Sequence, residues 1–162
     1  MPGREIKEHG NMRCCVCLFL GVLWLSGGLY GEEKPASGTR YGITLDLKAY
    51  PQGTAKDTLT SILKATESKR VDYVVAQLAD PSFVDDRVKR LYGGRFEEQV
   101  EDTRARLDPI TLKQLQRFLK DGDWQEAGEH VTVRLKDNER ALHFKKEKDR
   151  WFIQHTSKPA MN

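Results

Sequence analysis

The stretch HVTVRLKDNERALHFKKEKDRWFIQH, residues 130–155, alternates apolar and polar side chains in three short runs. A period of two is typical of β-strands that bury one face. Asp137-Asn138 separates the first two runs, and a second turn falls near residues 147–149. Asp and Asn tolerate the backbone of tight hairpins. The stretch therefore predicts three antiparallel strands that follow one another as a meander.

The register of these strands follows from one apolar face. A two-residue turn at Asp137-Asn138 sets Val133 opposite Leu142 and Val131 opposite Phe144. If the second turn has two or four residues, Phe144 lies opposite Trp151; a three-residue turn would instead direct Phe152 inward. A buried apolar face normally determines register. With a second turn of two or four residues, one face of the sheet carries all the large apolar residues except Phe152, namely Val131, Val133, Leu135, Leu142, Phe144, Trp151 and Ile153.

Three histidines lie in this stretch, and the register separates them. His130 and His143 are expected as diagonal neighbours on the polar face, whereas His155 shares the parity of Trp151 on the other side of the sheet. Zinc requires three or four ligands. The sequence therefore predicts no metal site and no cofactor.

Residues 54–121 show helical periodicity instead of alternation. Thr54 with Asp57 is a capping-box pattern before a helix from Ala55 to about Ser68. Further apolar stripes predict helices over 71–79, 84–92, 96–107 and 110–121, separated by Asp-Pro and Gly-Gly pairs. The acidic pairs on these helices, including Glu101-Asp102, are expected on solvated faces. The fold class is α+β, with N-terminal helices packed on a C-terminal antiparallel β-meander.

The N-terminal residues 13–31, RCCVCLFLGVLWLSGGLYG, place a basic residue before an apolar core and then small residues. This order is typical of a secretory signal peptide, with an uncleaved membrane anchor as the alternative. We expect residues 1–31 to form this segment, with Met1 or Met12 as the start. Residues 32–53 follow as a linker and short extended arm, then one domain over 54–157 and a tail over 158–162. The protein is expected to be exported, either to the periplasm or outside the cell.

Composition excludes several classes of function. The formal charge of the 162 residues is +3, and basic and acidic residues are interspersed, which argues against nucleic-acid binding. All three cysteines precede residue 18, so no disulfide or thiolate site lies in the predicted domain. The chain lacks the phosphate-loop, dinucleotide, serine-hydrolase and zinc-protease motifs. Membrane association is expected only if the N-terminal segment stays attached.

The weak catalytic candidates are Asp72, Tyr73 and Asp80, which flank an apolar run. A buried carboxylate beside a tyrosine could act as general base with a hydrogen-bond donor. Alternatively, Asp72 lies on the outer face and Asp80 only caps or turns the chain before Pro81.

Helices followed by a meander that closes on Arg150, Trp151, Phe152 and Ile153 resemble the nuclear transport factor 2-like (SnoaL-like) superfamily. The resemblance covers roughly residues 54–156 and rests also on the runs VTVR and LHF. It implies a curved, cone-like sheet around a pocket, in a superfamily of isomerases, dehydratases and non-catalytic binding domains. The chain is also similar to uncharacterised exported bacterial proteins.

Three functions follow as hypotheses. The first is a non-catalytic exported domain that binds an unknown protein or a small molecule. The second is a small isomerase- or dehydratase-like enzyme with an Asp base. The third is a membrane-tethered accessory domain.

Overall fold

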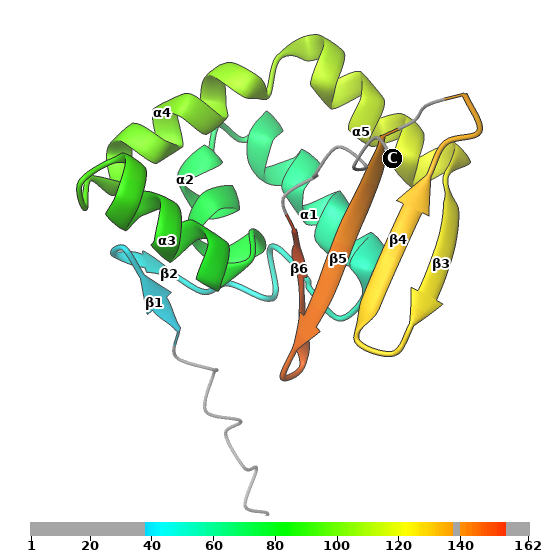
Figure 1. Ribbon diagram of the computed structural model, residues 1–162, viewed down its shortest axis with the longest axis horizontal. Helices are drawn as coiled ribbons and strands as arrows, with labels where there is room; N and C mark the ends of the chain where they lie inside the picture. Colours follow the sequence, from blue (N-terminus) through cyan, green and yellow to red (C-terminus); the bar gives the residue numbers. More distant parts are fainter. Residues whose placement is uncertain (1–37, 138–139, 155–162) are drawn as a thin grey trace, which may run out of the picture. The chain divides into compact units, whose positions relative to one another are not determined.

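A computed structural model describes residues 38–137 and 140–154 of the chain. The fold is α+β, as the sequence predicts: helices precede a four-stranded antiparallel sheet (Figure 1). The predicted signal segment, the tail, His155 and the Asn138 half of the first turn lie outside the described residues.

The sheet is a meander in which each strand pairs with the next along the chain. Its strands are β3 (Asp123–Ala127), β4 (His130–Arg134), β5 (Ala141–Glu147) and β6 (Arg150–Ile153). The predicted register of the first hairpin is confirmed, with Val133 paired to Leu142 and Val131 paired to Phe144. Strand β3 adds a fourth strand, whose Trp124 pairs with Val133 and so shares the apolar face.

The second hairpin pairs differently from the prediction. Phe144 lies opposite Ile153, and Trp151 lies opposite Lys146, because Lys148-Asp149 forms the two-residue turn. Lys148 has a positive φ of 57° there. The shift amounts to two positions, so the apolar residues keep the same face. Phe152 lies on the other face but is also buried, with the Arg150 guanidinium carbon 4.8 Å from its ring centre.

The first helices follow the caps read from the sequence. Helix α1 (Ala55–Glu67) begins where the Thr54 side chain accepts a hydrogen bond from the Asp57 amide. The predicted helix over 71–79 is a short α2 (Val71–Tyr73) continued as a π-helical turn, η1 (Val74–Leu78). A π-turn adds a residue per turn.

Three longer helices complete the helical part: α3 (Pro81–Leu91), α4 (Phe96–Arg106) and α5 (Pro109–Asp121). Asp80 caps α3 and Asp108 caps α5, each with proline at the first helical position. Such a proline is tolerated because the amide it removes has no intrahelical partner.

The helices form two apolar clusters. In one, α1, α5 and η1 cover the apolar face of the sheet around Leu59, Phe118 and Phe144. In the other, residues of α2 and η1 pack with α3 and α4, among them Val84 and Phe96. Figure 1 shows α3 and α4 on one side of the view and the four-stranded sheet on the other, with α1 between them.

The N-terminal arm is a small hairpin where the sequence predicts a strand or extended arm over 41–47. Strands β1 (Thr39–Arg40) and β2 (Ile43–Thr44) flank a turn at Tyr41-Gly42, where both residues have positive φ. The Tyr41 ring stacks on Phe96 at 4.2 Å, and Arg40 forms an ion pair with Asp85. Further along, Tyr50 and Gln52 are buried. The packed domain therefore includes part of the predicted linker.

The free edge of β6 is covered by residues far away in sequence. The Trp151 amide donates to the Gln52 backbone carbonyl at 3.0 Å, and the Trp151 carbonyl accepts from the side chains of Gln52 and Thr58. The Asp80 amide donates to Ile153 at 2.9 Å. This closure protects an edge that could otherwise pair with another chain. Among the described residues, no helix has the length and apolar character that crossing a membrane requires.

Candidate functional site

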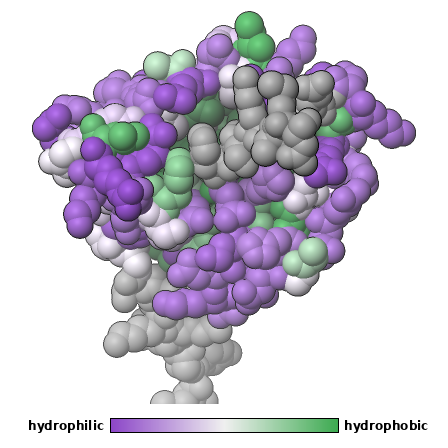
Figure 2. All heavy atoms as spheres, viewed as in Figure 1, coloured by the Kyte–Doolittle hydropathy of each residue, from purple (hydrophilic) through white to green (hydrophobic). Residues whose placement is uncertain are grey.

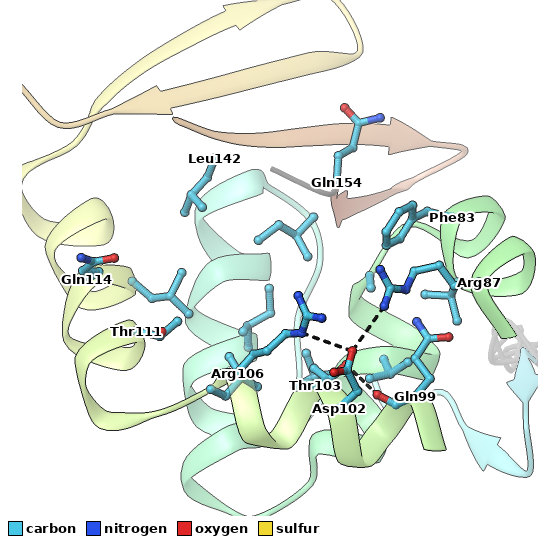
Figure 3. A pocket seen from close by; sticks show the side chains of 18 of the residues that line it. Phe83, Arg87, Gln99, Asp102, Thr103, Arg106, Thr111, Gln114, Leu142 and Gln154 are labelled. Carbon is cyan, nitrogen blue, oxygen red and sulfur yellow. Dashed lines mark hydrogen bonds and ion pairs between the residues drawn. The ribbon is translucent and has the colours of Figure 1, made fainter. Parts of the chain in front are cut away.

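A cavity of about 290 Å³ lies between the helices and the end of the sheet (Figure 3). Its walls come from α1, η1, α3, α4, α5 and the last two strands. Ligand pockets typically measure ~300–1,000 Å³, so this cavity suits a small molecule. The polar lining residues are Arg87, Gln99, Asp102, Thr103, Arg106, Thr111, Gln114, Arg140 and Gln154, and the apolar ones include Ile62, Val75, Phe83, Leu115 and Leu142.

The deep part of the cavity is apolar because the two helical clusters meet there. Leu115 and Phe118 of α5 belong to the cluster that covers the sheet, whereas Val75 and Val84 belong to the second cluster. Leu107, between α4 and α5, packs against both clusters. The cavity is therefore a gap between two separately packed groups of side chains.

An ion-pair cluster centred on Asp102 lies on the helical side of the cavity. Its Oδ2 atom accepts from Arg87 Nη2 at 3.3 Å, from Arg106 Nε at 3.2 Å and from the Tyr92 hydroxyl at 2.8 Å. Arg87 also donates to the Tyr92 hydroxyl at 2.8 Å. In Figure 3 the two arginines approach Asp102 from α3 and from the last turn of α4. The cluster fixes the side chains of two helices against each other.

The hydrogen bond from Tyr92 and the nearby guanidinium of Arg106 lower the pKa of Asp102, although partial burial opposes them. Asp102 is therefore ionised at neutral pH, and its low basicity makes it a poor proton acceptor. Arg87 and Arg106 carry two positive charges against this one carboxylate. This wall of the cavity is consequently cationic.

Gln99, one turn before Asp102 on α4, also lines the cavity. Its side chain is 4% exposed, and its Oε1 atom has no hydrogen-bond partner among the residues that the structure describes. A buried amide oxygen without a partner costs about 1–3 kcal/mol. The Gln99 amide is therefore an unused polar group at the cavity wall.

Asp72 and Tyr73, two of the predicted catalytic candidates, do not line the cavity. Asp72 forms an ion pair with Arg70 at 3.0 Å on the surface. Tyr73 is buried, but its hydroxyl is engaged by the backbone of Asp46, from whose amide it accepts at 3.0 Å. Burial raises the pKa of Tyr73, which makes it a weaker acid.

Asp80, the third candidate, lies next to the cavity but not in its wall. Burial would raise its pKa, but hydrogen bonds from the Ser82 hydroxyl and amide outweigh burial and lower it. Gln154, a lining residue, also donates to this carboxylate. Asp80 thus caps α3, and the structure brings none of the three candidates together in a cleft.

The histidines of the sheet lie where the register places them. Thr132 pairs with His143 and Lys145 with His130, so His130 and His143 are diagonal neighbours on the face away from the core. The Thr132 hydroxyl is 3.1 Å from His143 Nδ1. Within residues 38–137 and 140–154, no cluster of three or more His, Cys, Asp or Glu residues could hold a metal ion.

The polar residues of the cavity were missed by the sequence reasoning. Asp102 belongs to an acidic pair that is expected on a solvated face, and its side chain, still 34% exposed, also lines the cavity. One available signal was Arg106, four residues after Asp102, since i,i+4 pairs meet on a helix. No local pattern indicated Arg87 as the second partner.

No protein-family model, curated protein or solved structure matches this chain.

Proposed function

We propose that this protein is a non-catalytic binding domain that holds a small, largely apolar molecule in the cavity between its helices and sheet. One observation carries the proposal: a cavity of about 290 Å³ with a largely apolar surface, to which α3, α4, α5 and the residues beside the last two strands add polar side chains. Ligand sites typically combine such an apolar interior with a small number of fixed polar groups.

The lining also supports binding over catalysis. Its carboxylate, Asp102, is already paired with two arginines, and the described lining residues include no histidine, cysteine or lysine. General acid–base catalysis needs a group whose pKa lies near the working pH. The lowered pKa of Asp102 moves it away from that range.

The remaining hypotheses stay predictions. A cavity between helices and an antiparallel sheet supports membership of the nuclear transport factor 2-like superfamily, and the order of residues in 13–31 supports export. The hypotheses of a protein partner and of a membrane tether rest on the sequence alone.

The test uses octanol, a neutral probe small enough for the cavity, and two matched variants. Gln114→Trp places an indole at the cavity wall, whereas Gln116→Trp puts the same group on the exposed face of α5. We expect titration calorimetry to show one saturable site in the wild type and in Gln116→Trp, but none in folded Gln114→Trp. Equal binding by both variants, or no binding by the wild type, would refute the proposal.

A further inference from the structure

One polar side chain of the cavity wall, Arg106, has hydrogen-bond donors that are free to contact a ligand. Arg106 extends from the last turn of α4 towards the sheet side of the cavity (Figure 3). Its Nε atom is held by Asp102 at 3.2 Å. No described residue forms a hydrogen bond with its terminal Nη1 and Nη2 atoms. A guanidinium offers five donors, so most of those of Arg106 remain available.

Asp102 fixes where this guanidinium lies. The carboxylate is itself held by Tyr92 and Arg87, so Arg106 is anchored at one nitrogen by a group that cannot easily move. Pre-positioning lowers the ordering cost that binding otherwise incurs. The ion pair with Asp102 therefore restricts where the largely exposed Arg106 guanidinium lies at the wall.

Arg106 also marks the mouth of the cavity. Its side chain is 66% exposed, whereas Val75, Leu115 and Phe118 at the far wall are buried. Figure 2 shows that the face of the molecule seen in Figure 1 is mostly hydrophilic, with smaller hydrophobic areas between the polar residues. A ligand that matches this gradient has a polar end at Arg106 and an apolar body directed inward.

Gln99 lies on the same wall, seven residues and about two helical turns before Arg106, and its unpartnered atom is the acceptor Oε1. An amide oxygen cannot donate to a carboxylate, so Gln99 takes no part in holding an anion. The terminal nitrogens of Arg106 are donors, so a ligand group with several acceptor oxygens can engage them. A carboxylate has such oxygens and forms strong, charge-assisted bonds with a guanidinium.

We propose that the ligand is a small amphiphilic carboxylate whose headgroup binds Arg106 while its apolar chain fills the cavity. This inference rests on the proposed function. Arg106 is the binding residue, and Asp102 and Arg87 are positioning residues. No covalent step is involved.

The test compares three eight-carbon probes with the same apolar chain: octanoate, octanol and octyltrimethylammonium. We expect the wild type to bind octanoate about tenfold more tightly than octanol, in line with the strength of hydrogen bonds to charged groups. The cationic probe should bind most weakly. The octanoate advantage should shrink as salt is added, because Arg106 is partly exposed.

The variant Arg106→Gln distinguishes the contribution of the ligand headgroup to the affinity from the contribution of the apolar cavity. In this variant we expect octanoate affinity to fall about tenfold, to the octanol level, with octanol affinity unchanged. Arg90→Gln, which removes an exposed arginine outside the lining, should leave both affinities at wild-type values. Thermal unfolding of each variant confirms that it is folded.

Each result decides between the two proposals. If octanol and octanoate bind the wild type equally, or Arg106→Gln weakens both alike, the carboxylate inference fails while the binding function stands. Tighter binding of the cationic probe has the same consequence. If none of the probes binds, the proposed function fails and the carboxylate inference fails with it.

Discussion

Gly122 is the position at which a single side chain would most directly disturb the fold. It follows α5, with φ −70° and ψ 142°, a backbone that any residue can adopt. The restriction is spatial: an added Cβ would lie 2.3 Å from the Phe118 carbonyl oxygen and 2.4 Å from Val133 Cγ2. Helix and sheet approach each other here without room for a methyl group.

We therefore expect Gly122→Ala to lower the free energy of unfolding by about 1–3 kcal/mol, the usual cost of overpacking. Chemical denaturation measures the loss. Gly53→Ala is the matched control, since its Cβ would meet its nearest atom, Asp57 Oδ2, at an ordinary 3.5 Å. A Gly122→Ala protein as stable as Gly53→Ala would contradict the close approach.

Helix α1 ends in a Schellman motif that carries an unusual residue. The Lys69 amide donates to Thr66 and the Arg70 amide to Ala65, which satisfies two of the last carbonyls. Lys69 has φ 59°, the left-handed conformation that glycine normally occupies at this position. A side chain there costs about 1 kcal/mol relative to glycine.

Replacing Lys69 by glycine should therefore stabilise the protein by roughly 0.5–1 kcal/mol, which is less than the full relief of strain because glycine gains more entropy on unfolding. The shift of the denaturation midpoint gives the value. Lys113→Gly, in the exposed interior of α5, should instead destabilise by about 1 kcal/mol. If both changes lower stability, the left-handed assignment of Lys69 is wrong.

The two ends of the described chain are joined through the Gln52–Arg150 contact. Gln52 is buried, donates to the carbonyls of Gln77 and Trp151, and accepts from Arg150 Nη2 at 2.8 Å. Arg150 forms hydrogen bonds with neutral groups of Gln52 and Gln77, and burial lowers its pKa. Gln52 thus connects the N-terminal arm, η1 and β6.

Gln52→Leu should lower the free energy of unfolding by about 2–4 kcal/mol, because it leaves the half-buried Arg150 guanidinium and two carbonyls short of partners. Chemical denaturation again provides the measurement. Gln116→Leu, on the exposed face of α5, should stay within about 0.5 kcal/mol of the wild type. A similarly small effect at Gln52 would show that the network does not hold the ends together.

The local features of the fold could be predicted from the chain alone. The caps at Thr54, Asp80 and Asp108, the first hairpin register and the shared apolar face of the meander depend on residues close in sequence. Periodicity and capping report such local energetics directly. The predicted register of the second hairpin was wrong by two positions. The apolar residues face the same side of the sheet in both pairings, so their pattern could not distinguish between the two registers.

The candidate site, in contrast, was decided by tertiary structure. Arg87, Asp102, Leu115 and Leu142 line one cavity although they lie on α3, α4, α5 and β5. Their meeting depends on how two apolar clusters pack and where a gap remains between them, which no local pattern records. For the same reason, the sequence predicts Asp102 only as a surface acidic residue, although it lines the cavity. Its catalytic candidates Asp72, Tyr73 and Asp80 lie outside the cavity lining.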